Sequence, residues 1–408
     1  MNSGDTAWLL TSSALVLLMT PALAFFYGGM VRRKNLLSTI MMSFAILCLI
    51  SVLWVIYGYS LSFGPDVRGL VGDLSWIGLT GVGQDPSPVY AGTVPQLAFV
   101  AFQATFAIIT VALWTGAVVE RIKFGALLAF AALWFTLVYC PVAHWVWGSG
   151  GWLAQLGALD FAGGTVVHVN AGISALALAL VLGPRMGFKE GEAVEPNNIP
   201  YVVLGAALLW FGWFGFNAGS ALTAGGLASN AFITTNTSAA AAGFTWMMLG
   251  WIHRRPSVLG AATGAVVGLV AITPAAGYVP VWAAIPIGVI ASLISYYMMV
   301  WRAKSSSIDE SLDVFACHGM GGTWGALATG IFATTTVNAS ASGLIDGNWK
   351  QVLIQAAAIA ATMAYAFVVS WLLAKALKAT IGLRVKEEEE SVGLDISQHG
   401  ENAYGGVL

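Results

Sequence analysis

The chain has 408 residues, of which 58% are hydrophobic and only 9% charged, and its mean hydropathy is +0.79. A soluble globular domain carries about 25% charged residues, so the composition excludes a soluble domain and predicts a membrane protein. The net charge of −2 offers no basic surface for nucleic acid. Cys48, Cys140 and Cys317 lie in separate segments without metal-ligand or disulfide spacing. We therefore expect no metal, no cofactor and no nucleic-acid partner.

Stretches without Asp, Glu, Lys or Arg predict where the chain crosses the lipid bilayer. They cover residues 6–31, 35–65, 86–119, 124–159, 161–184, 196–253, 256–301, 314–345 and 351–374. A spanning helix needs about 20 apolar residues. The stretches 196–253 and 256–301 are each long enough for two spans, with breaks at 217–226 and 273–280. The sequence thus predicts an all-α polytopic membrane protein with eleven transmembrane helices.

The placement of basic residues predicts the orientation of these helices, because cytoplasmic loops are enriched in Lys and Arg. With the N-terminus outside, the cytoplasmic set is Arg32, Arg33, Lys34, Arg121, Lys123, Arg185, Lys189, Arg254, Arg255, Arg302, Lys304, Lys375, Lys378, Arg384 and Lys386. These are 15 of the 17 basic residues, and Arg68 and Lys350 alone remain outside. We predict that the N-terminus is outside and the C-terminus inside.

The first apolar segment resembles a signal peptide, since LLTSSALVLLMTPALA ends in a cleavage-like ALA. A signal peptide carries its basic residues before the apolar core. Here Arg32, Arg33 and Lys34 follow the core and none precedes it. We therefore interpret this segment as the first span of the mature protein.

The predicted spans divide into five, five and one. Five is odd, so the second set runs opposite to the first, which is the topology of an inverted repeat with its site between the halves. We expect a membrane domain over 1–380, with repeats at about 6–185 and 196–335 and an eleventh helix at about 350–378. The charged segment 381–408 then forms a cytoplasmic tail.

Two histidines occupy corresponding spans: His168 lies in the fifth and His318 in the tenth, preceded by Asp160 and Asp313 respectively. Ionisable residues inside spans are rare and usually functional, although each ring could simply join helices by hydrogen bonding. No acidic residue accompanies the histidines within the spans. A cation pathway usually contains one, so we expect a neutral solute to pass two neutral imidazoles.

A group of aromatic residues is predicted on the outer side. Phe106 lies in the third span, Trp147 in the loop after the fourth, and Phe216 with Ser220 at the outer end of the sixth. Single aromatics at this depth are usually interfacial anchors. Together these four residues could hold a small cation by cation–π attraction, with the hydroxyl accepting a hydrogen bond.

The run DFAGGTVVHVNAGISALALALVLGPR (160–185) closely resembles the signature segment of ammonium transporters of the Amt/Mep/Rh family, on the Amt branch. Similar motifs cover most of the chain: PALAFFYGGMVRRKN (21–35), QATFAIITVAL (103–113), GWFGFNAGS (212–220), FACHGMGGTWG (315–325) and GLRVKEEEESVGLDISQHGENAY (382–404). The resemblance implies a homotrimer of eleven-helix subunits, each with its own pore. The short tail and the absence of a signal peptide favour the plasma (inner) membrane of a prokaryotic cell. It implies a transporter rather than an enzyme.

The resemblance also implies roles for individual residues. Trp147, Phe106 and Ser220 would recruit ammonium, with methylammonium as its analogue, and Phe106 with Phe216 would form a phenyl gate beneath them. His168 and His318 would line the pore. Asp160 would hold the structure around the outer vestibule. The tail would pack on the cytoplasmic face and take part in regulation by a PII-type signal protein.

Three other interpretations remain open at this point. An Rh-like channel would pass neutral ammonia or carbon dioxide, although a cation-recruiting aromatic cluster is of little use to it. An ammonium sensor could act through a separate PII protein. A sodium-coupled carrier is least favoured, because the spans lack acidic residues, and the absence of a GxxxxGK[ST] motif argues against an ATP-driven pump.

Overall fold

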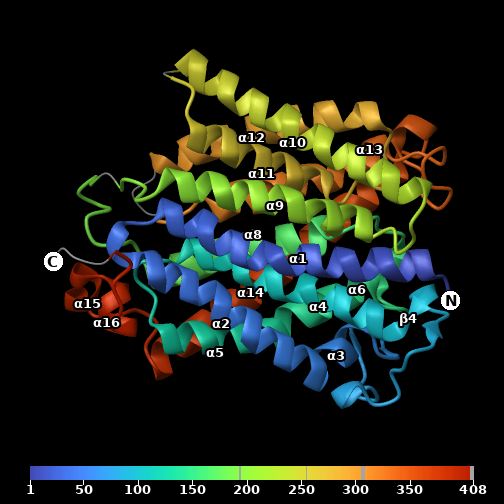
Figure 1. Cartoon of the computed structure of the whole chain (residues 1–408), viewed down its shortest axis with the longest axis horizontal. Helices are drawn as coiled ribbons and strands as arrows, with labels where there is room; N and C mark the ends of the chain where they lie inside the picture. Colours follow the sequence, from blue (N-terminus) through green and yellow to red (C-terminus); the bar gives the residue numbers. More distant parts are fainter. Residues whose placement is uncertain (193, 254, 305–307, 405–408) are drawn as a thin grey trace.

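We describe the fold from a computed structural model, which covers residues 1–192, 194–253, 255–304 and 308–404. Most helices run side by side along the long axis of the molecule, and the two chain ends lie at its opposite ends (Figure 1). Arg254, which the sequence analysis counted among the cytoplasmic basic residues, and positions 405–408 of the predicted tail lie outside the described residues.

The first part of the chain forms a set of helices ending near Leu182. In chain order they are α1 (Ser3–Met30), α2 (Leu36–Leu53), α3 (Tyr59–Phe63), α4 (Gln96–Leu113), α5 (Phe124–Trp134), α6 (Cys140–Trp147), α7 (Trp152–Leu156) and α8 (Asn170–Leu182). Helical turns of π type connect or precede several of them: η2 (Trp54–Gly58), η5 (Phe135–Tyr139) and η6 (Gly164–Val169). Short 3₁₀ turns are η1 (Arg33–Asn35), η3 (Ile77–Leu79) and η4 (Trp114–Ala117).

The second part begins with α9 and ends in the tail. Its helices are α9 (Ile199–Gly219), α10 (Gly226–His253), α11 (Val258–Ile272), α12 (Ala284–Ala303), α13 (Gly321–Phe332), α14 (Lys350–Thr380), α15 (Glu387–Val392) and α16 (Leu394–His399). The π-type turn η8 (Phe315–Met320) leads into α13. The 3₁₀ turns are η7 (Val281–Ala283) and η9 (Leu344–Asp346).

Two small antiparallel hairpins lie between α3 and α4. The first pairs β1 (Asp66–Val67) with β2 (Val71–Gly72), and the second pairs β3 (Pro86–Ser87) with β4 (Ala91–Pro95). Both hairpins belong to the outer loop that the sequence predicted between the second and third spans. The first hairpin contacts α6 through β2, whereas β4 of the second hairpin contacts α1 and α4.

The predicted membrane fold is confirmed. Eight helical segments within the described residues are long and apolar enough to cross a bilayer: Ser3–Met30, Arg33–Phe63, Gln96–Ala117, Phe124–Leu156, Gly164–Leu182, Ile199–Gly219, Val281–Ala303 and Lys350–Thr380. α10, the shorter apolar helix α11 and the η8–α13 segment lie outside this set. The count of eleven and the orientation stay predictions.

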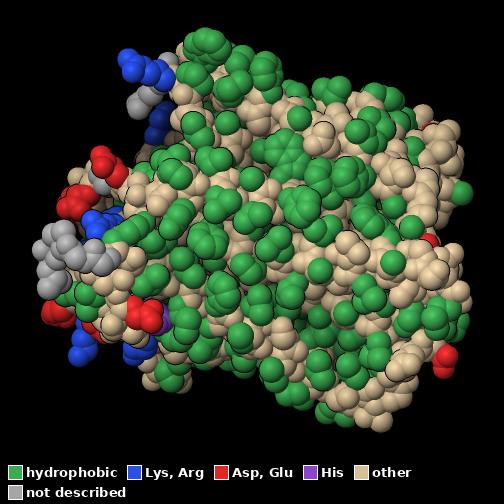
Figure 2. All heavy atoms as spheres, viewed as in Figure 1, with side chains coloured by type: hydrophobic (Ala, Val, Ile, Leu, Met, Phe, Trp, Pro, Cys, Tyr) green, Lys and Arg blue, Asp and Glu red, His purple; other side chains and the backbone are tan. Residues whose placement is uncertain are grey.

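The surface supports a bilayer around the middle of the molecule. Hydrophobic side chains cover most of the visible face, whereas Lys and Arg side chains gather at the end that carries the C-terminus (Figure 2). Exposed apolar residues on several helices, among them Phe44, Phe211 and Leu353, are 44%, 54% and 58% exposed. Lipid contact accounts for such exposure, because hydrocarbon removes the free-energy cost that water would impose.

One of the contacts between the first and second parts of the chain is made by α1 and α9, which run side by side (Figure 1). A Cβ added at Gly205 of α9 would collide with the backbone of Phe26 and Ala22, and one added at Gly212 would collide with Met19. Glycine therefore sets the close approach of these helices, as small residues do between membrane helices. This contact brings the residues of α9 next to those of α4 and η6, and so forms the site.

The tail folds back on the helix ends. Val385 N–H donates to the carbonyl of Arg121, and Leu394 N–H donates to Asn35 Oδ1 at 2.8 Å. Asp395 Oδ1 accepts from Ser38 N–H at 2.7 Å, at the N-terminus of α2. Its carboxylate faces the positive end of that helix dipole, which anchors the tail to the bundle.

Candidate functional site

A cavity of about 380 Å³ opens at the end of the molecule that carries the hairpins. Phe106, Trp147, Asp160 and Ser220, all singled out from the sequence, contribute to its lining together with Gln103, Phe161, Tyr278 and Asn338. The four predicted residues come from four places in the chain: α4, α6, the segment before η6 and the residue after α9. The structure therefore brings the predicted outer residues together around one space.

Trp147 is the last residue of α6, whereas the sequence predicted it in the following loop. Gly148, which follows, has an extended backbone and ends the helix, so the ring is presented at a helix end with a fixed orientation. Its indole Nε1–H donates to the carbonyl of Asp160 at 2.9 Å. The ring meets Phe106 edge to face, with centroids 5.9 Å apart and planes at 85°.

Two phenyl rings close the floor of this cavity. Phe106 and Phe216 stack with centroids 4.2 Å apart and planes at 28°, and both side chains are buried. Phe106 faces the outer cavity and Phe216 faces the space below. Ser220, one turn after Phe216, donates its hydroxyl to the Phe216 carbonyl at 2.9 Å, so its oxygen lone pairs can accept a bond from a solute.

Beneath the phenyl rings lies a narrow apolar space of about 10 Å³. This is close to the volume that a single water needs. Its lining is apolar apart from His168, His318 and the indole of Trp213. The space therefore offers imidazole nitrogens and hydrocarbon, and no carboxylate belongs to its described lining.

The two histidines meet face to face. Their ring centroids are 5.2 Å apart, and the two Nδ1 atoms lie 3.2 Å apart. Each ring sits on a six-residue π-type turn, η6 for His168 and η8 for His318. Such turns are rare and concentrate at functional sites, and here they place both rings at the narrow space.

A buried carboxylate lies a few residues before each of these turns and accepts hydrogen bonds from the backbone N–H groups there. Asp160 accepts four backbone N–H bonds of 2.7–3.0 Å, from Gly163, Gly164, Thr165 and Val166. Burial raises the pKa of Asp160, although these four bonds counteract the effect. The carboxylate thus caps the helix that carries His168 and contributes to the wall of the outer cavity.

In the second part of the chain, Glu310 accepts backbone hydrogen bonds before His318 as Asp160 does before His168. The sequence had suggested Asp313 for this position. Glu310 accepts from Val314 and Phe315 N–H at 2.6 and 3.0 Å. It precedes His318 by eight residues, the same spacing that separates Asp160 from His168. Asp313 instead pairs with Arg302 at 2.5 Å. Burial, followed by the Asp313 carboxylate, raises the pKa of Glu310 to about 7.

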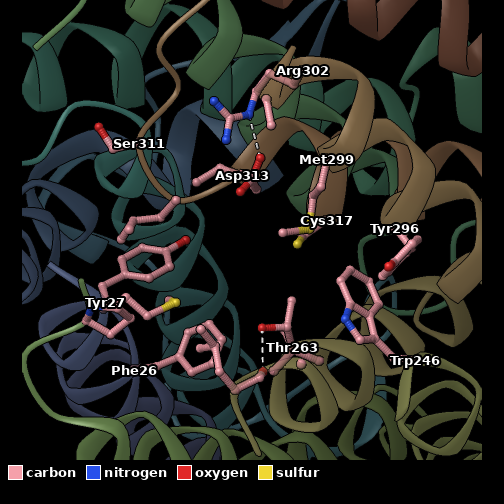
Figure 3. Close-up of a pocket in the computed structure, with 18 of the residues that line it drawn as sticks. Phe26, Tyr27, Trp246, Thr263, Tyr296, Met299, Arg302, Ser311, Asp313 and Cys317 are labelled. Carbon is pink, nitrogen blue, oxygen red and sulfur yellow. Dashed lines mark hydrogen bonds and ion pairs between the residues drawn. The ribbon is translucent and has the colours of Figure 1, made fainter. Parts of the chain in front are cut away.

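A second cavity, of about 480 Å³, opens on the other side of the histidines. Tyr27, Thr263, Arg302, Asp313 and Cys317 surround it, and the Arg302–Asp313 pair lies at its rim (Figure 3). His318 contributes to the lining of both this cavity and the narrow space. The molecule therefore contains two wide cavities with a narrow space between them, which the histidine pair lines and the Phe106–Phe216 stack separates from the outer cavity.

Buried ion pairs close the end of the bundle near the second cavity. Glu120 contacts Arg32 and Arg185 at 3.0 and 3.1 Å, and Arg185 also contacts Asp309 at 2.8 Å. Burial acts to raise the pKa of both carboxyls, but the surrounding guanidinium groups outweigh it and hold both pKa values below their usual range. These carboxylates are therefore ionised at neutral pH.

Sequence reasoning missed two residues of the site. Trp213 stacks on His168 with centroids 5.5 Å apart and donates its Nε1–H to Thr273. Gln103 is 9% exposed at the outer cavity, and its Oε1 has no hydrogen-bond partner within the part of the chain that is described. Each precedes a selected phenylalanine by three residues, Phe216 and Phe106, and so shares its helix face. That spacing was the available signal.

Comparison with known proteins agrees with this architecture. Residues 7–404 match the model of the Ammonium Transporter Family. The chain is 53% identical to "Ammonium transporter Amt1" of Archaeoglobus fulgidus, covering 99% of this chain and 100% of the relative. It is 52% identical to "Ammonium transporter" of Bacillus subtilis, with 99% of each chain covered. The crystal structure of Saccharomyces cerevisiae Mep2 superposes with a TM-score of 0.91 at 36% identity, covering 99% of this chain and 92% of that one.

These findings confirm the predicted multi-pass membrane localisation, and the archaeal and bacterial relatives support the predicted prokaryotic origin. The identity extends over nearly the full length of both relatives, so it includes the segments that form the two cavities and the histidine pair. The chain belongs to the ammonium transporter family.

Proposed function

We propose that the chain transports ammonium by recruiting NH₄⁺ in the outer cavity, removing its proton and conducting NH₃ past His168 and His318. The observation that supports this proposal most is the order in which the outer cavity, the phenyl stack and the narrow space follow one another. An aromatic cavity of about 380 Å³ precedes the Phe106–Phe216 stack, and an apolar space of about 10 Å³ follows it. The first suits a cation and the second a small neutral molecule.

The outer cavity has the groups that a small cation needs. The faces of Trp147 and Phe106 offer cation–π attraction, and the Ser220 oxygen can accept a hydrogen bond from N–H. The two oxygens of the Asp160 carboxylate already accept hydrogen bonds from four backbone N–H groups. Asp160 therefore supports the wall and contributes its negative charge without being a direct ligand.

The narrow space discriminates between ions by their chemistry. Potassium and ammonium have similar size and charge, but ammonium can lose a proton. With a pKa close to the value of about 10.4 for a lysine amine, that loss costs roughly 4–5 kcal/mol at pH 7, at about 1.36 kcal/mol per unit. Moving an unpaired ion into an apolar interior costs several kcal/mol or more. For ammonium, losing the proton therefore costs no more than entering the narrow space as an ion. Potassium has no proton to lose and must enter as an ion.

The histidine pair gives the neutral solute hydrogen-bond partners along this path. Ammonia can both donate and accept hydrogen bonds, and a neutral imidazole offers one donor and one acceptor nitrogen. His168 Nε2 has no partner within the described residues, so it is free to bind the solute. We include in the proposal that the removed proton crosses to the inner side by a separate route and rejoins the ammonia there, so that each transported ammonium carries one net positive charge.

The wider assembly is also a proposal. We infer two inverted five-helix repeats followed by α14, three subunits per assembly, and N-out, C-in orientation. The equal eight-residue spacings from Asp160 to His168 and from Glu310 to His318 support the repeat. The contacts of the tail with Arg121, Asn35 and Ser38 support a regulatory role for residues 381–404, with a PII-type protein as partner.

Transport by the purified protein in liposomes tests the proposal. Methylammonium should enter and potassium should be excluded, and current on a supported membrane should accompany ammonium. Equal potassium flux would remove the proposed selectivity. Uptake without current and without competition by methylammonium would instead favour the neutral-gas channel. Absence of any flux, together with ammonium-dependent binding of a PII-type protein, would favour the sensor.

A further inference from the structure

His144 lies in α6 one turn before Trp147, and the proposed transport path does not use it. Its side chain is completely buried. The ring Nδ1 lies 3.0 Å from the carbonyl oxygen of Ser62 at the end of α3. The ring Nε2 lies 2.9 Å from Asp66 Oδ1 on β1. One imidazole therefore joins three segments of the outer end of the molecule.

The chemistry of its partners determines how many protons this ring carries. A backbone carbonyl can only accept a hydrogen bond, and an ionised carboxylate can only accept. Asp66 also accepts from Gly69 N–H, at 2.8 Å to one oxygen and 3.0 Å to the other, so both of its oxygens act as acceptors here. Both ring nitrogens must then donate. The contacts are satisfied by an imidazolium beside a carboxylate.

Further bonds connect the β1–β2 hairpin to the chain around Trp147. The indole of Trp145 donates to the Leu70 carbonyl at 2.8 Å, and Trp152 N–H donates to the Gly69 carbonyl at 3.1 Å. Gly150 has φ +96°, and a Cβ there would lie 2.6 Å from Asp66 Cβ. The hairpin and the α6–α7 turn are therefore packed tightly around the His144–Asp66 contact.

Trp147 is held on both sides by this arrangement. His144 fixes the helix turn before it, and two residues after it Ser149 N–H donates to the Tyr90 hydroxyl at 2.9 Å. Tyr90 itself contributes to the lining of the outer cavity. The position of the indole thus depends on the contacts that hold the last turn of α6 to the outer loop.

We propose that His144 and Asp66 form a proton-dependent latch that positions Trp147 for cation binding in the outer cavity. His144 is a positioning residue, and the proposal rests on the proposed ammonium recruitment. Loss of the proton leaves a ring nitrogen with a lone pair facing a carboxylate, so two acceptors oppose each other at 2.9 Å. The hairpin then loosens, and the outer site weakens at alkaline external pH.

The other titratable groups nearby are placed differently. The elements packed against α6 carry Tyr59 on α3, Tyr139 on η5 and His168 on η6, and Cys140 lies one turn earlier on α6 itself. Arg68 is exposed, and the partly exposed Asp73 accepts a hydrogen bond from the Ser75 hydroxyl. Within the described residues, Asp66 is the charged group that contacts the imidazole.

Nitrogen NMR of ¹⁵N-histidine-labelled protein in lipid measures the proton count directly. The His144 signals are assigned by their loss in His144→Gln. We expect both nitrogens of His144 to be protonated at neutral pH and one to lose its proton as the pH rises. Protection of the amides of residues 66–72 from hydrogen exchange, corrected for the intrinsic rate, should fall together with it. A neutral ring at pH 7 would overturn the proposal.

Substitutions separate the latch from general effects of pH on transport. Asp66→Asn supplies an amide N–H for Nε2 of a neutral ring, so it closes the latch without a shared proton. Between about pH 6 and pH 9, the half-saturating concentration of methylammonium cation should rise about tenfold in the parent protein and stay constant in Asp66→Asn. His144→Gln should be weak throughout. Asp73→Asn, which removes a neighbouring, partly exposed carboxylate, should keep the parent profile.

The outcomes distinguish this proposal from the proposed function. A pH profile in Asp66→Asn equal to that of the parent would overturn the latch while leaving ammonium transport intact. Absence of methylammonium uptake at every pH would overturn the proposed function. In that case, nitrogen NMR and hydrogen exchange still decide whether the imidazolium holds the hairpin, because neither measurement needs a transported solute.

Discussion

The Nδ1 atoms of His168 and His318 lie 3.2 Å apart, although 150 residues separate them in the sequence. Two ring nitrogens can share a hydrogen bond only when one donates and the other accepts. The pair therefore holds a single proton between its rings, which fixes the tautomer of each relative to the other. The position of that proton also determines which of the two Nε2 atoms carries a proton, so the two histidines act as one unit.

Replacement of both histidines with aspartate should relax selectivity toward potassium. A carboxylate in the narrow space offsets the cost of an unpaired cation, so the barrier no longer depends on loss of a proton. We expect potassium flux in liposomes to rise at least about tenfold relative to the parent, corresponding to about 1.4 kcal/mol. His253→Asp, which changes a histidine that lines neither the two cavities nor the narrow space, should retain potassium exclusion. If the double variant still excludes potassium, the histidines have a purely structural role.

Gly172→Ala should abolish the close contact between the two histidine-bearing segments. A Cβ at Gly172 would collide with the backbone N and Cα of Gly319, the residue after His318. Overpacking of this kind costs about 1–3 kcal/mol, and it moves the rings apart. We expect a lower melting temperature and loss of methylammonium uptake.

The matched control for this prediction is Gly125→Ala. A Cβ at Gly125, in the first turn of α5, would meet no atom within 4 Å. Alanine is favoured over glycine in a helix by up to about 1 kcal/mol, so this variant should be as stable as the parent or slightly more so. Equal behaviour of the two variants would argue against a backbone constraint at Gly172.

Acid should unfold the protein through the carboxylates of Glu120 and Asp309. Their pKa values are lower in the folded chain than in the unfolded one, because Arg185 and neighbouring guanidinium groups overcome the effect of burial. The unfolded state then binds more protons, and the stability from these groups is lost as pH falls below about 4, through the folded pKa values. Thermal unfolding in detergent at neutral and acidic pH measures this loss.

Asp309→Asn separates these ion pairs from other acid effects. It removes one partner of a buried pair, which should destabilise the protein at neutral pH by about 3–5 kcal/mol. At the same time it should reduce the dependence of the melting temperature on pH. Glu388→Gln, at an exposed position of α15, should change neither quantity. An unaltered acid dependence in Asp309→Asn would assign the effect to other groups.

Sequence reasoning located the spans and the histidine pair because both depend on features that repeat along the chain. Charge-free stretches marked the apolar helices, and the predicted division into five and five spans suggested that His318 corresponds to His168. The pairing of Asp160 with Asp313 was wrong because the nearest acid was chosen. The correct partner, Glu310, keeps the eight-residue spacing from its histidine.

Other features depend on backbone geometry and on contacts between residues that are far apart in the sequence. The π-type turns η6 and η8 shift the helix register around each histidine, and no residue pattern in either turn marks them. The His144–Asp66 contact joins residues 78 positions apart. It becomes visible only when the hairpin is folded over the end of α6.

Asp395→Ala should release the tail from the bundle. Burial raises the pKa of Asp395 against the opposing effect of hydrogen bonds from the first turn of α2. These include Ser38 N–H at 2.7 Å, and a carboxylate at a helix N-terminus stabilises it by about 0.5–2 kcal/mol. We expect faster hydrogen exchange over residues 383–399 and easier proteolysis there, while transport by the membrane helices continues at an altered rate. Val392→Ala, at a side chain 57% exposed on α15, should leave both protection and rate unchanged. Loss of protection in Asp395→Ala without any change in transport would show that the docked tail stabilises the bundle but does not regulate it.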